Sequence, residues 1–177
     1  KHYKNHILPN GFKAMIVTAS RHAALIYKEQ LDKLQAPESA VIISGDHNDE
    51  KRFHEFTDGT KHKKQIEDFK KPLGVGEGKS NLSILIVKDM LLTGFDSPRL
   101  KKLYVGRVIK AHNLLQTLTR VNRTYKDHSY GYVVDFAGIE SEFEKTNRDY
   151  FNELSSQLGD EMEHYSNLFK SADEIDK

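Results

Sequence analysis

The sequence has no cysteine, no hydrophobic run near the roughly 20 residues that a membrane-spanning helix needs, and no secretory signal pattern. The missing cysteines exclude disulfide bonds and thiolate metal sites, and they are compatible with the reducing cytoplasm, where we expect the protein to reside. The nine histidines are scattered and include no His-Glu-x-x-His motif, so we expect neither a metal site nor contact with a membrane.

The 177 residues are enough for one domain with a tail, and a hydrophobic content of 37% is adequate for its core. Because the chain begins with Lys1 rather than Met, we interpret it as a piece of a larger protein. Residues 140–177 carry 11 acidic and 4 basic side chains, a net charge of −7, and since the whole chain carries +1, residues 1–139 carry +8. We expect a basic domain, residues 1–139, followed by an acidic helical extension, residues 140–177. The basic domain suggests a polyanionic partner.

Short apolar runs alternate with amphipathic stretches along the chain. The runs predict strands at residues 13–18, 40–44, 82–87, 102–105 and 131–136. Helices are predicted from a cap at Ser20 to about residue 34, at 60–71, and from 111 to about 125. This alternation predicts an α/β fold with a mostly parallel sheet and helices on both faces. Ligands of such sheets bind beyond the carboxyl ends of the strands, here the loops after residues 18, 44, 87 and 105.

The helix predicted at residues 111–125 carries a polar and an apolar face. Gln116, Arg120 and Arg123 lie at i, i+4 and i+7, so they project from one side. The opposite side carries Leu114, Leu118 and Val121. Two aligned guanidiniums suit phosphate oxygens, as in arginine fingers that stabilise charge on a leaving γ-phosphoryl group. An isolated Arg-x-x-Arg pair is more often a solvated pair with carboxylate partners, so the neighbouring segments decide between the two interpretations.

Residues 78–80, Gly-Lys-Ser, look like the end of a phosphate-binding loop. That motif requires a glycine where this chain has Leu73, and it opens a helix, whereas this segment leads into a predicted strand. We interpret residues 72–81 as a surface loop. The chain therefore lacks the element that cradles ATP phosphates, and we expect it not to hydrolyse ATP alone.

The loop after the strand at residues 82–87 contains Thr93-Gly94-Phe95-Asp96. Gly94 allows close approach of the backbone to a ligand, and Asp96 can accept hydrogen bonds from a ribose hydroxyl or an arginine. Thr93 offers a hydroxyl and an amide to a phosphate. Taken alone, the same residues also fit an ordinary turn with an Asx cap.

Together, this loop and the arginine-bearing helix resemble motifs V and VI of superfamily 2 helicases and translocases, which belong to the second of two RecA-like domains. Motif VI in that family is Gln-x-x-Gly-Arg-x-x-Arg, and this chain matches it except for Thr119 at the small Gly position. The residues and spacing from 92 to 123 are similar to the motor of type I restriction enzyme R subunits. Their Ser-Gly turn is matched at residues 44–48 and their closing strand at 131–138. Those subunits often have Asp-Lys where this chain has Gly106-Arg107, a difference to which we attach no functional weight.

The resemblance implies that ATP lies between two motor domains, with the phosphate loop and the Mg²⁺-binding carboxylate on a first domain outside this chain. Arg120 and Arg123 would then reach the γ-phosphate, and Gln116 would orient the site. Gly94 and Asp96 would lie near the ribose and couple the nucleotide state to DNA contact. The nuclease of the restriction enzyme would also lie outside this chain.

The resemblance further implies that double-stranded DNA crosses the carboxyl edge of the sheet. Thr18, Ser20 and Arg21 follow the first strand, where the family's motif IV contacts backbone phosphates, and Thr93 is the candidate in motif V. Hydroxyls, amides and one arginine suit the sequence-independent phosphate contacts of a translocating motor. Ser20 is equally well explained as a helix cap, and both roles are compatible.

The implied partners are the first motor domain of the same chain and the modification (methyltransferase) and specificity subunits of a restriction complex. Two alternatives stay open from the residues alone: another superfamily 2 helicase, and a RecA-like module that binds partners without catalysis. A phosphate loop and an acidic Mg²⁺ motif upstream in the parent chain would favour the motor. The acidic extension has no assigned role; docking of the methyltransferase subunits and packing on the sheet are both compatible with its sequence.

Overall fold

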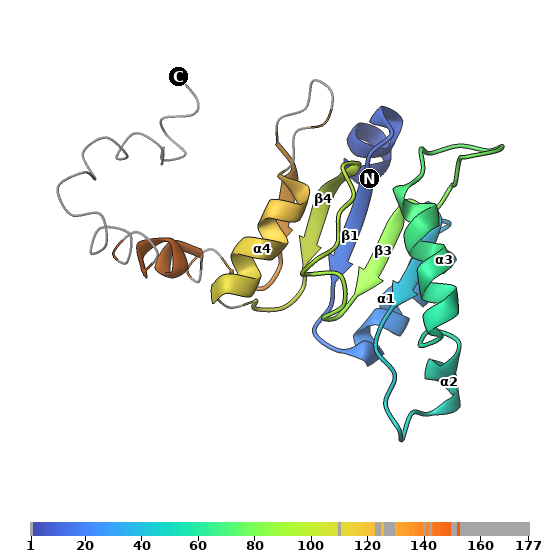
Figure 1. Cartoon of the computed structure of the whole chain (residues 1–177), viewed down its shortest axis with the longest axis horizontal. Helices are drawn as coiled ribbons and strands as arrows, with labels where there is room; N and C mark the ends of the chain where they lie inside the picture. Colours follow the sequence, from blue (N-terminus) through green and yellow to red (C-terminus); the bar gives the residue numbers. More distant parts are fainter. Residues whose placement is uncertain are drawn as a thin grey trace.

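A computed structural model describes residues 2–109, 111–122, 125, 130–139, 141, 143–149 and 152 (Figure 1). These residues form a five-stranded sheet in the order β2-β3-β1-β4-β5, in which every neighbouring pair is parallel. The strands are β1 (Lys13–Val17), β2 (Ser39–Ile42), β3 (Ile84–Val87), β4 (Leu100–Val105) and β5 (Tyr132–Asp135). All five predicted strands are confirmed, with ends that differ by at most two residues.

The helices are α1 (Arg21–Lys33), α2 (Lys51–His54), α3 (Gly59–Lys70) and α4 (Ala111–Val121). The three predicted helices are confirmed as α1, α3 and α4. Helix α2 and two helical turns at the N-terminus, Tyr3–Ile7 and Leu8–Asn10, were not predicted. They are too short to show a helical hydrophobic period, so the sequence pattern does not predict them. Residues 71–83 are irregular, as predicted for the Gly-Lys-Ser segment.

Alternate residues of β1, β2, β3 and β4 pack against opposite layers of helices, because side chains of a strand alternate between the two faces of a sheet. Met15 and Val17 of β1 face a layer that contains α3 and α4, and they share a core with Phe69 and Leu114. On the other face, the core contains Ala14, Ile16, Ala24 of α1, and Tyr3 and Ile7 of the N-terminal turns. Helices therefore cover both faces, as predicted for a parallel sheet with buried strands.

The connection between β3 and β4, residues 88–99, contains no helix. It starts at the carboxyl end of β3 and finishes at the amino end of β1, where the amide of Lys13 donates to the carbonyl of Arg99 (2.8 Å). Leu92 and Phe95 are buried in the same core as Leu114 and Phe69, so the connection crosses the face that α3 and α4 cover. The sequence did not predict this path.

Candidate functional site

The carboxyl ends of β1 and β3 are tied together by Thr18. Its amide donates to the carbonyl of Val87 (2.8 Å), and its hydroxyl oxygen lies 3.0 Å from the same carbonyl and from that of Ser20. The side chain of Thr18 is fully buried. The structure therefore gives Thr18 a role in the edge of the sheet, and its contact with DNA stays a prediction.

Ser20 caps the first turn of α1. Its backbone is extended, with φ −151°, and its hydroxyl accepts a hydrogen bond from the amide of Ala23 (3.0 Å). The predicted cap is confirmed. Because the first amides of α1 point toward the carboxyl edge, this helix end carries a partial positive charge that favours an anion nearby.

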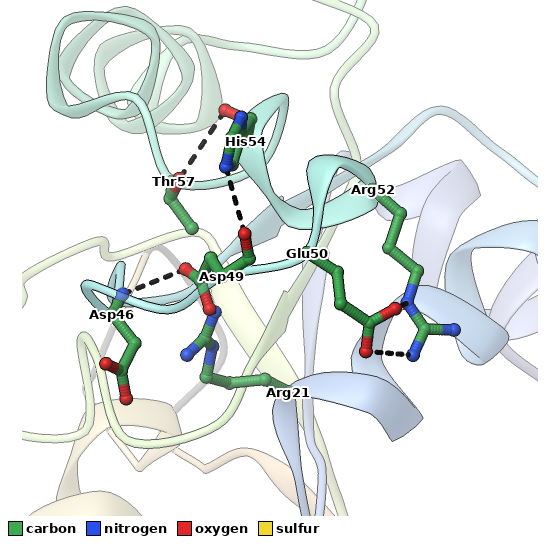
Figure 2. Close-up of polar contacts among 7 residues, drawn as sticks. All are labelled: Arg21, Asp46, Asp49, Glu50, Arg52, His54 and Thr57. Carbon is green, nitrogen blue, oxygen red and sulfur yellow. Dashed lines mark hydrogen bonds and ion pairs between the residues drawn. The ribbon is translucent and has the colours of Figure 1, made fainter.

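Arg21, the first residue of α1, is held by the loop that follows β2 (Figure 2). Its guanidinium forms an ion pair with Asp49 and stacks over the ring of Phe53, 4.6 Å from the centroid. Asp49 also accepts a hydrogen bond from the amide of Asp46 (2.8 Å). The hydrogen bond from Arg21 lowers the pKa of Asp49 below its usual value. Arg21 thus orders the turn at residues 46–49 beside the start of α1.

The middle of the β3–β4 connection alternates between buried and exposed side chains. Leu92 and Phe95 are buried, and the ring of Phe95 lies 6.0 Å from that of Phe69. Thr93, Gly94 and Asp96 are exposed. Gly94 has φ +71°, a left-handed conformation that favours glycine, although an added Cβ would meet no atom within 4 Å. The apolar anchors therefore hold the three predicted site residues at the surface.

Helix α4 has the two faces that its sequence predicts. Leu114 and Val121 are buried, and Leu118 is partly buried against the same core. Gln116 and Arg120 are half-buried on the other side. Arg123 lies outside the described residues, so its position stays a prediction.

Arg120 has an incomplete set of hydrogen bonds. Its Nε is buried and has no acceptor within the described part of the chain. A buried, unsatisfied guanidinium nitrogen is costly, and an anionic oxygen would satisfy it. The Nε atoms of Arg21 and Arg107 are buried without an acceptor in the same way. What sets Arg120 apart is that its phosphate contact is also the one that the motif on α4 predicts.

The predicted site residues fall on two neighbouring parts of the molecule. Ser20 and Arg21 lie at the carboxyl edge of the sheet, beside Thr18. Gln116 and Arg120 lie on α4, and Arg120 is in its last turn. In Figure 1, α4 lies beside β4 and runs back toward the amino edge of the sheet. The β3–β4 connection links these two parts, because it starts at the carboxyl edge and crosses the face on which α4 packs.

Sequence reasoning missed a second arginine–carboxylate pair at the carboxyl edge. Arg107, just after β4, donates to the carboxylate of Asp89 (2.6 Å) and to the carbonyl of Lys88 (3.3 Å). The only signal in the sequence was a basic residue two positions after a predicted strand. Elsewhere in the described ranges, His, Asp and Glu side chains form no group of three or more that could hold a metal ion. Within the same ranges, no helix combines the length and apolarity needed to cross a membrane.

Comparisons with known proteins connect the chain to one family. The family model for domain 3 of type I restriction enzyme subunit R matches residues 47–138. A protein of Methanocaldococcus jannaschii that is named for the endonuclease subunit of the type I restriction enzyme MjaIXP is 36% identical over 159 residues, which cover 89% of this chain. The type I restriction enzyme HindI endonuclease subunit of Haemophilus influenzae is 28% identical over an alignment of 178 positions, which covers 93% of this chain. The chain spans 15% and 16% of the lengths of these two relatives.

A solved structure supports the fold. The C-terminal part of the Fun30 ATPase domain superposes with a TM-score of 0.54 at 14% identity, covering 82% of this chain and 41% of that chain. At this identity the likeness concerns the fold alone. Together with the parallel five-stranded sheet, it confirms the predicted α/β RecA-like fold.

Proposed function

Because the chain belongs to the type I restriction enzyme R subunit family, we propose that it is the second motor domain of an ATP-dependent DNA translocase within a type I restriction endonuclease. The first motor domain, which would hold ATP and Mg²⁺, and the nuclease would lie elsewhere in the parent chain. The proposed partners are double-stranded DNA and the modification and specificity subunits of a cytoplasmic restriction complex.

The observation that carries this proposal is the arrangement of Gln116 and Arg120 on the side of α4 opposite Leu114 and Val121. Arg120 presents a buried Nε without an acceptor among the described residues, and Gln116 lies one helical turn before it. This arrangement supports Arg120 as a donor to a terminal phosphate of ATP bound to the first domain. Arg123, three residues further on, is the second proposed arginine finger. When bound, ATP supplies the free energy for movement along DNA.

The chain's own residues would stabilise charge and orient the site. The guanidiniums of Arg120 and Arg123 would hold the negative charge that grows on the terminal phosphate oxygens, which is the main contribution of an arginine finger. Gln116 would keep the site oriented. The exposed backbone at Gly94 allows close approach to the nucleotide, and the carboxylate of Asp96 would accept a hydrogen bond from a ribose hydroxyl.

DNA would cross the carboxyl edge of the sheet. The N-terminal amides of α1, the hydroxyl of Ser20 and the guanidinium of Arg21 are proposed to contact backbone phosphates there. Thr18 and the exposed Thr93 complete the proposed set. In this structure Arg21 is paired with Asp49, so a phosphate would share or replace that carboxylate. These contacts carry no sequence information, as a translocating motor requires.

The test is DNA-stimulated ATP hydrolysis by the parent protein with its partner subunits. We expect Arg120→Ala and Arg123→Ala to lower kcat by about 10² or more, because arginine fingers contribute on the order of 10³ to 10⁵ in rate. Lys33→Ala is the control, since Lys33 forms an exposed ion pair with Glu29 (2.6 Å) in the last turn of α1, outside the proposed site. Unchanged rates in both finger variants would instead favour a RecA-like binding module.

A further inference from the structure

Arg107 bridges three strands at the carboxyl edge of the sheet. The amide of Gly106, the residue before it, donates to the carbonyl of Val17 and so ties the end of β4 to the end of β1 (2.8 Å). From there the guanidinium reaches the end of β3, where it contacts Lys88 and Asp89. Since β1 lies between β4 and β3 in the sheet, the side chain spans the carboxyl end of β1.

The contacts of Arg107 hold the first two residues of the β3–β4 connection. Its Nη2 lies 2.6 Å from Oδ1 of Asp89 and 3.3 Å from the carbonyl oxygen of Lys88, and its side chain is 26% exposed. The second carboxylate oxygen of Asp89 accepts from Nζ of Lys88 (2.7 Å). Both contacts come from Nη2, whose two N–H groups can donate to the carbonyl and to the carboxylate at the same time.

The connection needs such a fixed point because it has little regular structure. It contains two left-handed residues, Leu91 at φ +68° and Gly94 at φ +71°. Its middle is anchored by Leu92 and Phe95 in the core. Its far end is held where Nη1 of Arg99 donates to the carbonyl of Lys70 (3.1 Å). Segments with few backbone hydrogen bonds open most easily, so the anchors decide how well such a segment is placed.

We propose that Arg107 is a positioning residue that holds the carboxyl-edge end of the β3–β4 connection, so that Thr93 meets DNA in the correct place. This inference rests on the proposed function. Arg107 acts through Asp89 and the Lys88 carbonyl, and it does not itself bind DNA phosphate. We call the contacts of Arg107 with Lys88 and Asp89 the clamp. The same connection carries Gly94 and Asp96, so the clamp also links the proposed DNA contact to the proposed nucleotide contact.

The experiment uses the complete parent protein with its partner subunits. ATP hydrolysis is measured against DNA concentration, at several salt concentrations, for native protein, Arg107→Ala, Asp89→Ala and the double variant. Lys33→Ala is the control, since it removes an exposed ion pair with Glu29 in the last turn of α1, at the end of the helix away from the carboxyl edge. Arg120→Ala reports separately on the proposed motor. Thermal unfolding of each variant shows whether it is folded.

We expect Arg107→Ala to raise the DNA concentration for half-maximal stimulation about tenfold, with a smaller change in kcat at saturating DNA. Asp89→Ala should raise this DNA concentration as well. The double variant should need no more DNA than Arg107→Ala, because both changes break the same contact. The salt dependence of DNA binding should stay unchanged, since no charged phosphate contact is removed. Arg107→Lys should be intermediate, and it supports the same comparison if Arg107→Ala does not fold.

Three results would overturn the inference. The first is that Arg107→Ala weakens DNA stimulation while Asp89→Ala leaves it unchanged or strengthens it. If the slope of log DNA affinity against log salt concentration also falls by about one in Arg107→Ala, Arg107 would be assigned to a phosphate. If Arg107→Ala behaves as the native protein while Arg120→Ala stops hydrolysis, the positioning role of Arg107 is refuted and the proposed motor function is kept. A parent protein without DNA-stimulated hydrolysis would remove the proposed function and this inference together.

Discussion

Gly94 offers a direct test of the backbone at the proposed nucleotide side. The residue has φ +71°, and a Cβ placed there would meet no atom within 4 Å. Gly94→Ala therefore introduces no clash, and its cost is the left-handed conformation of an L-residue, about 1–2 kcal/mol. Alanine also lowers the entropy of the unfolded chain, which offsets about 0.4–1 kcal/mol of this cost.

A second glycine provides the matched control. Gly59, the first residue of α3, is not left-handed, and a Cβ there would also meet no atom within 4 Å. Gly59→Ala gains the same unfolded-state entropy without the backbone strain. The entropy terms cancel between the two variants, so Gly94→Ala should be less stable than Gly59→Ala by about 1–2 kcal/mol.

The assay is thermal and urea unfolding of the two variants of the 177-residue chain. For a chain of this size, the expected difference corresponds to melting temperatures roughly 2–8 °C apart. A Gly94→Ala variant as stable as Gly59→Ala would refute the reasoning, because it would show that φ at residue 94 is not held in the left-handed region. If the variant relaxes to a negative φ, Thr93 and Asp96 should shift, and hydrolysis by the parent should fall even where stability is kept.

Two further predictions concern residues that flank the site and the core. Ser20→Ala should lower the free energy of unfolding by about 1 kcal/mol in urea denaturation, because the amide of Ala23 loses its acceptor; an equal loss in Ser20→Thr would contradict the capping role. Burial lowers the pKa of Lys13 from 10.5 to about 8, so between these values the unfolded chain binds more protons and stability rises with pH. In urea denaturation, the free energy of unfolding of Lys13→Met should therefore rise less between pH 8 and 10 than that of the native chain. At pH 7 the variant should be more stable than the native chain. A pH dependence identical to that of the native chain would show that Lys13 keeps its ordinary pKa.

The sequence predicted the elements that build this domain, because their signals are local. Buried strands such as β3 appear as short apolar runs, and α4 appears as two faces at helical spacing. The burial of Leu114 and Val121 and the cap at Ser20 follow from the same local rules. The order and spacing of the motifs likewise indicated the family, and the family model and the relatives confirm it.

The sequence did not predict how charged side chains would be paired. Arg21 was predicted as a phosphate contact, and the structure shows it bound to Asp49, 28 residues away. Arg107 received no functional weight, yet it reaches Asp89, 18 residues away, across an intervening strand. Neither distance in sequence has a periodicity that would reveal the pair, since both depend on which loops meet at the carboxyl edge.

By itself, the sequence determined the α/β class, the family and the two faces of α4, because hydrophobic period and motif spacing act over short stretches of chain. Only the tertiary structure decided the central position of β1, the helix-free path of residues 88–99 across the α3–α4 face, and the Arg107 bridge between β4 and β3. These features depend on which strands pair and which apolar side chains share a core. That choice is made by packing between segments far apart in the chain.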